Sequence, residues 1–261
     1  MKYPKISIVT PSLNQGKYIE RCIQSVLIQY YPNFEHIIVD SGSQDETLRI
    51  LRKYSHLKWI SEPDDGQAQA INKGFATSQG ELLAWLNCDD EYRPGAFFSV
   101  ADAAVETQHQ AVIMGEVELY YEDAFLRVMK NYKRNFFRFL QPWIPYTNIS
   151  QSGVFIPRNV LNIIGELNKD LYFVMDYDLI CRMLRNKIRF YSINQIIARY
   201  NIHRSCKTGQ GWHYMYPELD RVSLRHASEL LRFQKLIFQL SFRFLRPSMR
   251  MIYRMVLPSI F

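Results

Sequence analysis

The sequence predicts an α/β protein with a mostly parallel central sheet flanked by helices. In the first half of the chain, short apolar runs typical of buried strands alternate with segments whose apolar residues recur at helical spacing. Strands that alternate with helices form right-handed β-α-β units, and such units build parallel sheets. The chain has 261 residues, of which 48% are hydrophobic, so it is long enough to bury a substantial core.

The first half divides into short elements. We expect strands at 5–10, 36–40, 57–61 and 81–86, where apolar residues dominate. We expect helices at 18–30, where apolar residues recur every three or four positions, and at 67–77, which ends near Gly80. Ser43 and Glu46 form a capping-box pattern, which predicts a further helix that continues to Tyr54.

The second half is less regular. Residues 111–120 are strand-like, 159–165 and 176–186 have helical spacing, and 187–200 contain two strand-like runs. The aromatic and basic stretch at 121–147 fits neither pattern.

The positive charge of the chain is concentrated in its last part. The formal net charge is +7, and residues 221–261 hold eight lysines and arginines against one acidic residue, Glu229. Residues 1–220 are therefore neutral overall. We expect a domain at 1–220 followed by a basic helical segment at 221–261.

That basic segment has two stripes at helical spacing. The polar stripe is Arg232, Lys235, Gln239, Arg243, Arg246 and Arg250, and the apolar stripe is Leu230, Phe233, Ile237, Leu240 and Phe244. Pro247 is expected to break or kink the helix. Such a helix can bind a membrane surface through anionic lipid. The alternative is packing on the domain or on a second subunit of a homodimer.

Composition and missing motifs disfavour several classes of protein. The four cysteines lie far apart without a C-x-x-C pair, which argues against a disulfide scaffold or a zinc site and favours a reducing compartment. No apolar run approaches the roughly 18 residues needed to span a bilayer, and we expect no signal peptide.

The neutral body argues against a nucleic-acid partner. The dinucleotide, P-loop and serine-hydrolase motifs are absent. We expect a cytoplasmic protein that is peripheral at the inner face of the cell membrane.

Polar residues follow the expected strands at their carboxyl ends, where parallel α/β sheets bind their ligands. These candidates are Pro11, Ser12, Asn14, Asp40, Glu62, Asp64, Asp65, Asn87, Asp89 and Asp90. The adjacent carboxylates Asp89 and Asp90 suit Mg²⁺ or Mn²⁺, which prefer oxygen ligands and substrate phosphates. The alternative for this pair is a turn in which an aspartate caps a helix.

Two later clusters also carry chemical groups. Asp176 and Asp178 begin a helix-like run, where Asp176 is a candidate general base and helix capping is the alternative. His203 is a candidate metal ligand or a structural histidine, and Ser205 and Lys207 are candidates to hold a pyrophosphate.

Five segments occur in the order seen in family 2 glycosyltransferases, and each resembles a motif of that family. They are 10–14 (TPSLN), 39–45 (VDSGSQD), 87–90 (NCDD), 152–155 (SGVF) and 176–179 (DYDL). The resemblance extends from about residue 6 to residue 208. It implies the GT-A fold and inverting transfer from a nucleotide-sugar donor.

The resemblance also implies roles for particular residues. The nucleotide pocket would comprise Pro11, Ser12, Asn14, Asp40, Asp64, Asp65, Asn87 and Asp89. Within that pocket, Asp40 would hydrogen-bond the base, usually uracil, and Asp64 or Asp65 would border the same pocket.

The implied metal site and catalytic base each depart from the family pattern at one position. Asp89 would bind Mn²⁺ or Mg²⁺, and His203 matches a late histidine that reaches metal or pyrophosphate. Asn87 stands where the family has an aspartate and adds no charge, so Asp90 is a second candidate ligand. Asp176 matches the catalytic base, preceded by Met175 where a glutamate is common.

The sequence thus predicts an inverting glycosyltransferase that uses a nucleotide-diphosphate sugar, expected to be a UDP-sugar. The acceptor would be a saccharide or lipid-linked acceptor in cell-surface polysaccharide or lipopolysaccharide synthesis. Asn87 and Met175 keep a non-catalytic binding subunit as the alternative. A nucleotidyltransferase would have a glycine-rich basic loop where residues 11–15 are PSLNQ.

Overall fold

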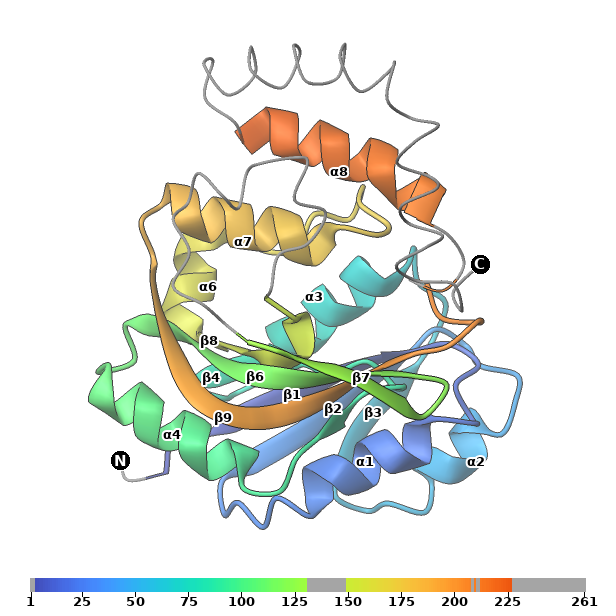
Figure 1. Ribbon diagram of the computed structural model, residues 1–261. Helices are drawn as coiled ribbons and strands as arrows, with labels where there is room; N and C mark the ends of the chain where they lie inside the picture. Colours follow the sequence, from blue (N-terminus) through green and yellow to red (C-terminus); the bar gives the residue numbers. More distant parts are fainter. Residues whose placement is uncertain (1–2, 131–148, 208, 210–211, 227–261) are drawn as a thin grey trace.

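The computed structural model describes residues 3–130, 149–207, 209 and 212–226 (Figure 1). Its first part contains β1 (Ile6–Ser12), α1 (Ile19–Leu27), β2 (Phe34–Asp40), α2 (Thr47–Leu51), β3 (Leu57–Ser61), α3 (Gln67–Thr77) and β4 (Leu82–Trp85). The four strands are parallel and lie in the order β3-β2-β1-β4. The predicted alternation of strands and helices is confirmed for this part of the chain.

The second part adds β5 (Glu91–Tyr92), α4 (Ala96–Glu106), β6 (Ala111–Tyr121), β7 (Ala124–Met129), the 3-10 turn η1 (Gln151–Gly153), β8 (Val154–Pro157), α6 (Arg158–Ile164), α7 (Met175–Arg185), β9 (Arg189–Ile202) and α8 (Trp212–His226). These strands extend the sheet in the order β4-β8-β6-β9-β5, with β7 paired to β6. β8 is antiparallel to β4 and β6, whereas β6 and β9 are parallel. The sheet is therefore mixed, and the two runs expected at 187–200 form one strand, β9.

Helices cover both faces of this sheet. In Figure 1, α1, α2 and α4 lie below it, and α3, α6, α7 and α8 lie above it. Buried side chains form a core on each side, where α3 and α6 on one face and α1 and α4 on the other turn apolar residues toward the strands. α3 approaches β1 closely at Gly74, where a Cβ atom would lie 2.4 Å from Val9 Cγ1.

The capping box expected at Ser43 and Glu46 is wrong. α2 begins only at Thr47, whose backbone N–H donates to Asp45 Oδ1 at 3.0 Å, and it ends at Leu51. The Ser43 hydroxyl donates instead to the Asp40 carboxylate, which the end of β2 places beside it. The Ser43 hydroxyl is thus engaged by a residue three positions earlier, and its oxygen also accepts the Asn14 N–H at 2.7 Å from a distant loop.

α8 packs against α7 and crosses the boundary expected between residues 220 and 221. Val222 is fully buried, and His226 Nε2 lies 2.9 Å from Asp178 Oδ1 on α7. The stripes expected between Leu230 and Arg250 lie outside the described residues. Within the described part of the chain, no helix is both long enough and apolar enough to cross a bilayer.

Candidate functional site

A cavity of about 580 Å³ opens where β1 and β4 end, beside the start of α7 and the loop after β9. Its wall includes most of the predicted site residues, namely Pro11, Ser12, Asp64, Asn87, Asp89, Asp90, Asp176, His203, Ser205 and Lys207. The carboxyl ends of neighbouring parallel strands meet at one edge of the sheet, which explains why segments far apart in sequence converge here.

Asp40 lies behind this cavity wall and not on it. Its carboxylate is fully buried and accepts hydrogen bonds from the backbone N–H groups of Gly42 and Ser43 and from the Ser61 hydroxyl at 2.7 Å. These bonds fix the loop after β2. The structure thus gives Asp40 a role in shaping the loop and does not bring its carboxylate to the cavity.

Asn14 and Asp65 are also outside the cavity wall. Asn14 joins two loops, because its N–H donates to Ser43 Oγ at 2.7 Å and its Oδ1 accepts the Gln44 N–H at 2.9 Å. Asp65 Oδ2 accepts a hydrogen bond from the Gln69 side chain at 3.2 Å on the surface. Both residues hold the loops that surround the site.

Asp89 and Asp90 point in different directions. Asp89 Oδ2 lies 3.1 Å from His203 Nε2, and the Asp89 side chain is 17% exposed. Asp90 is 1% exposed, and its Oδ1 accepts the backbone N–H of Asn201 at 3.0 Å. Burial, together with the neighbouring charge of Asp89, raises the pKa of Asp90 well above its usual range. The pair therefore offers one accessible carboxylate, that of Asp89.

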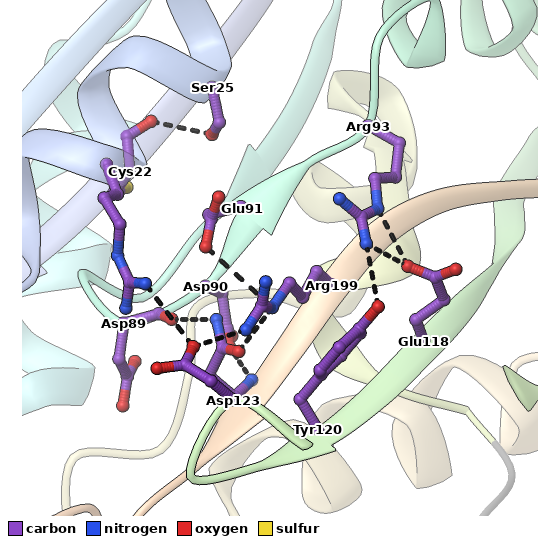
Figure 2. Close-up of polar contacts among 12 residues, drawn as sticks. Cys22, Ser25, Asp89, Asp90, Glu91, Arg93, Glu118, Tyr120, Asp123 and Arg199 are labelled. Atoms are coloured by element: carbon purple, nitrogen blue, oxygen red, sulfur yellow. Dashed lines mark hydrogen bonds and ion pairs between the residues drawn. The ribbon is translucent and has the colours of Figure 1, made fainter. Parts of the chain in front are cut away.

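A polar network behind Asp89 holds its backbone. The Asn201 side-chain amide donates to the Asp89 carbonyl at 2.6 Å, and Arg199 Nε donates to Asn201 Oδ1 at 2.6 Å. Arg199 also pairs with Asp123 at 2.6 Å in the turn between β6 and β7. Figure 2 shows this network, with the Asp89 carboxylate pointing away from Asp90 and Arg199. Sequence reasoning missed these residues, since no local motif marks them.

The orientation of the His203 ring is set by Tyr18 and Ser205. The ring stacks on Tyr18 with centroids 4.4 Å apart, and Nδ1 lies 2.9 Å from Ser205 Oγ. Partners at Nδ1 leave Nε2 directed at Asp89. Contacts of this kind orient a histidine that serves as a ligand.

Asp89 and His203 offer a carboxylate oxygen and an imidazole nitrogen, which are donors that Mn²⁺ accepts. Across residues 3–130, 149–207, 209 and 212–226, no group of three or more His, Cys, Asp and Glu side chains gathers to hold a metal by itself. A cation at this pair would need oxygen ligands from a bound diphosphate as well, which is the usual arrangement for Mg²⁺.

Asp176 and Lys207 lie on another part of the wall. Asp176 is in the first turn of α7, where its Oδ1 accepts the Tyr177 N–H at 2.8 Å, and burial raises its pKa. Burial lowers the pKa of Lys207 to about 8, although the charges of Glu218 and Asp176 oppose that shift. The site therefore combines a carboxylate of increased basicity with a lysine that loses its charge as the pH rises through about 8.

Gln67 connects two predicted residues. Lys207 Nζ donates to Gln67 Oε1 at 2.8 Å, and Gln67 Nε2 donates to Asn87 Oδ1 at 2.8 Å. Gln67 also lines the cavity. Its position directly after Asp64, Asp65 and Gly66 was the available signal in the sequence.

Residues 7–165 match the protein family described as Glycosyl transferase family 2. An uncharacterized glycosyltransferase of Rickettsia conorii is 28% identical over 198 residues, which cover 69% of this chain and 31% of the relative. A PGL/p-HBAD biosynthesis glycosyltransferase of Mycobacterium bovis is 28% identical over 208 residues, covering 77% of this chain and 75% of the relative. A putative teichuronic acid biosynthesis glycosyltransferase of Bacillus subtilis is 40% identical over 96 residues, covering 34% and 38%. The matched region is 31% of the length of the Rickettsia conorii relative and 64% of that of an uncharacterized glycosyltransferase of Rickettsia typhi.

Solved structures share the fold. S. aureus TarS 1–349 in complex with UDP-GlcNAc has a TM-score of 0.67 at 19% identity, covering 85% of this chain and 66% of TarS 1–349. The mannosyltransferase PcManGT from Pyrobaculum calidifontis, in complex with GDP-Man and Mn²⁺, has a TM-score of 0.58 at 17% identity, covering 82% and 60%. The family match includes more than half of the chain and confirms the resemblance seen in the motifs. This chain belongs to glycosyl transferase family 2.

Proposed function

We propose that this chain is an inverting glycosyltransferase that moves a sugar from a nucleotide-diphosphate donor to an acceptor hydroxyl. The observation that carries the proposal is that Asp89 and Asp176, which come from different elements, line one cavity. Membership of the family supports it. Asp89 is assigned to the donor diphosphate, and Asp176 is assigned to the acceptor hydroxyl.

Asp176 is the proposed general base. The acceptor oxygen attacks the anomeric carbon while its proton passes to the Asp176 carboxylate. The bond from that carbon to the diphosphate oxygen breaks on the opposite face, and the nucleoside diphosphate leaves with the electron pair. A single displacement of this kind inverts the anomeric configuration. The raised pKa of Asp176 strengthens it as a base, and general-base catalysis contributes about 10²–10⁴ in rate.

The other side of the cavity stabilises the leaving group, whose negative charge grows as the bond breaks. Lys207 and Ser205 line the wall, where an ammonium group and a hydroxyl donate to phosphate oxygens. Asp89 and His203 would hold Mn²⁺ or Mg²⁺, and such a cation acts as a Lewis acid on the diphosphate. Asp90 is buried and bonds the Asn201 N–H, so its proposed role is to hold the turn that follows β4.

The nucleotide would lie against the ends of β1 and β4, where Pro11, Ser12 and Asn87 line the cavity, with Asp64 bordering it. Asp40 would act there by fixing the adjoining loop. We propose a UDP-sugar as the donor, a choice supported by the UDP-GlcNAc complex of TarS. The GDP-Man complex of the mannosyltransferase makes GDP-sugars the comparison to test.

The acceptor is proposed to be a saccharide or a lipid-linked saccharide in cell-surface polysaccharide or lipopolysaccharide synthesis. Its support is that two relatives are named for teichuronic acid and PGL/p-HBAD biosynthesis. The basic composition of residues 221–261 supports a peripheral position at an anionic membrane.

Calorimetric titration with UDP-sugars and GDP-sugars, each with and without Mn²⁺, tests the donor and the metal together. We expect one nucleotide sugar to bind more tightly with Mn²⁺ and to be turned over with an acceptor extract. Proton NMR of the product should show an inverted anomeric configuration. Donor binding without any turnover would instead identify a non-catalytic binding subunit.

A further inference from the structure

The last described helix reaches back to the segment that precedes the proposed base. Glu218 lies on α8, and its side chain is 11% exposed. Its carboxylate accepts three backbone hydrogen bonds, from the N–H groups of Tyr172 at 2.8 Å, Phe173 at 2.6 Å and Val174 at 2.9 Å. Residues 172–174, which we call the strap, lead directly into α7 and Asp176.

The strap depends on Glu218 for these bonds. The N-cap residue of α7, Val174, has no side chain that caps the helix. A carboxylate near a helix N-terminus is favourable, and bonds from N–H groups to an ionised acceptor are stronger than neutral ones. α8 thus supplies from a distant part of the chain the acceptor that the strap lacks locally.

Lys207 holds the same strap at a different group. Its Nζ donates to the Tyr172 carbonyl at 3.2 Å and lies 3.9 Å from the centroid of the Tyr172 ring. Tyr172, Asp176 and Lys207 all line the cavity. The strap is therefore fixed through its N–H groups by Glu218 and through a carbonyl by Lys207.

We infer that Glu218 is a positioning residue for glycosyl transfer, which acts by holding the strap and so sets where Asp176 enters the cavity. This role rests on the function proposed above. A catalytic group displaced by about 1 Å can cost about 10²-fold in rate, because the reacting atoms are no longer aligned. Glu218 does not line the cavity, so its effect passes through residues 172–174.

The charges around Asp176 separate this role from a merely structural one. Within the described part of the chain, charged groups that act on it from neighbouring elements include Glu218 on α8 and Lys207 after β9. On α7 itself, Asp178 is paired with Arg182 and His226. Glu218 raises the pKa of Asp176, in addition to the larger effect of burial. Removing the charge of Glu218 should therefore shift the titration of the base to lower pH.

Two Glu218 variants and one control test the inference. Glu218→Ala should lower kcat by about 10- to 100-fold, with little change in donor Kd when both are measured well below the Lys207 pKa of about 8, where that lysine stays charged. Glu218→Gln keeps an oxygen acceptor without its charge, so its kcat should fall less, and the acidic limb of its kcat–pH profile should move to lower pH. Glu166→Gln, at an exposed residue before α7, makes the same charge change and should leave kcat and the profile unaltered.

Hydrogen exchange supplies a readout that does not depend on turnover. The amides of residues 172–174 should exchange faster in Glu218→Ala than in the unmodified chain, while the amides within α7 stay protected. If Glu218→Ala fails to fold, Glu218→Gln carries the same comparison. Unmodified kcat in the folded variants, unchanged exchange at the strap, or a lower kcat with an unmoved acidic limb in Glu218→Gln would each overturn the inference. Absence of turnover in the unmodified chain would instead overturn the proposed function, and this role with it.

Discussion

The imidazole Nε2 of His203 lies 3.1 Å from Asp89 Oδ2, although 114 residues separate the two in the chain. Asp89 follows β4 and His203 follows β9, and Asn201 at the end of β9 bonds the Asp89 carbonyl. The contact therefore results from strands that bring two distant loops together. It places a carboxylate and an imidazole side by side on the wall of the cavity that Asp176 also lines.

The Asp176→Asn variant tests the catalytic base. The asparagine amide has nearly the same shape as the carboxylate but is not a base. It does not take the proton from the acceptor hydroxyl, so kcat should fall about 10²- to 10⁴-fold. Donor affinity should stay nearly unchanged, because the residue faces the acceptor in this mechanism. Steady-state kinetics and calorimetry on the same preparation measure both quantities. Loss of donor binding would assign Asp176 to the donor pocket instead.

The Asp89→Ala variant tests the metal ligand. Donor binding should lose its dependence on Mn²⁺, because the accessible carboxylate is gone. Asp90→Asn is the matched control, since that carboxyl group is buried and its raised pKa favours the neutral form. Titrations with the donor at several Mn²⁺ concentrations compare the donor affinities of the two variants. Equal Mn²⁺ dependence in Asp89→Ala and the unmodified chain would refute the ligand role.

The pH dependence of donor binding tests Lys207. Its pKa is lowered to about 8 by burial, so the ammonium is charged below that pH and neutral above it. The charged form attracts the diphosphate, and donor Kd should therefore rise as the pH rises through about 8. Lys207→Met should bind the donor more weakly at pH 7 and should lack this rise. A rise of the same size in Lys207→Met would show that another group titrates.

Removal of residues 227–261 tests the membrane proposal while leaving α8 intact. The shortened chain should no longer sediment with anionic vesicles but should still bind donor. For the full chain, higher salt should weaken vesicle binding, because basic residues attract anionic lipid. Unchanged vesicle binding after truncation would count against the proposal.

A second truncation, after Asp220, serves as the comparison. It also removes Val222, which is fully buried, and His226, which bonds Asp178 on α7. Loss of buried contacts should lower the thermal midpoint of this shorter chain relative to the one that ends at His226. Equal midpoints would show that the end of α8 contributes no stability.

The first half of the fold was predictable because its signals are local. Apolar runs and helical spacing depend on neighbours within a few residues, and they located the strands and helices from β1 to β4. The same logic failed at Ser43, whose hydroxyl bonds Asp40 and also accepts the Asn14 N–H of a loop 29 residues away instead of capping a helix. It also failed across the two runs at 187–200, which pairing with β6 joined into β9.

The candidate site was predictable as a set of residue types but not as an arrangement. Asp89 and Asp90 are equivalent in the sequence, yet one carboxylate faces the cavity and the other bonds Asn201, which lies 111 residues away. Glu218 likewise acts on amides 44 to 46 residues distant. No local pattern marks such partners, because only folding brings them together.

The sequence by itself determined the alternation of strands and helices, the polar residues at the strand ends and the order of motifs that places the chain in its family. The tertiary structure alone decided which carboxylate is accessible, which loops Asp40 and Asn14 hold, and which distant residue secures the strap before Asp176. The physical reason is that periodicity along the chain sets which face of an element is buried, whereas burial and hydrogen bonding of a polar group depend on which segments pack beside it.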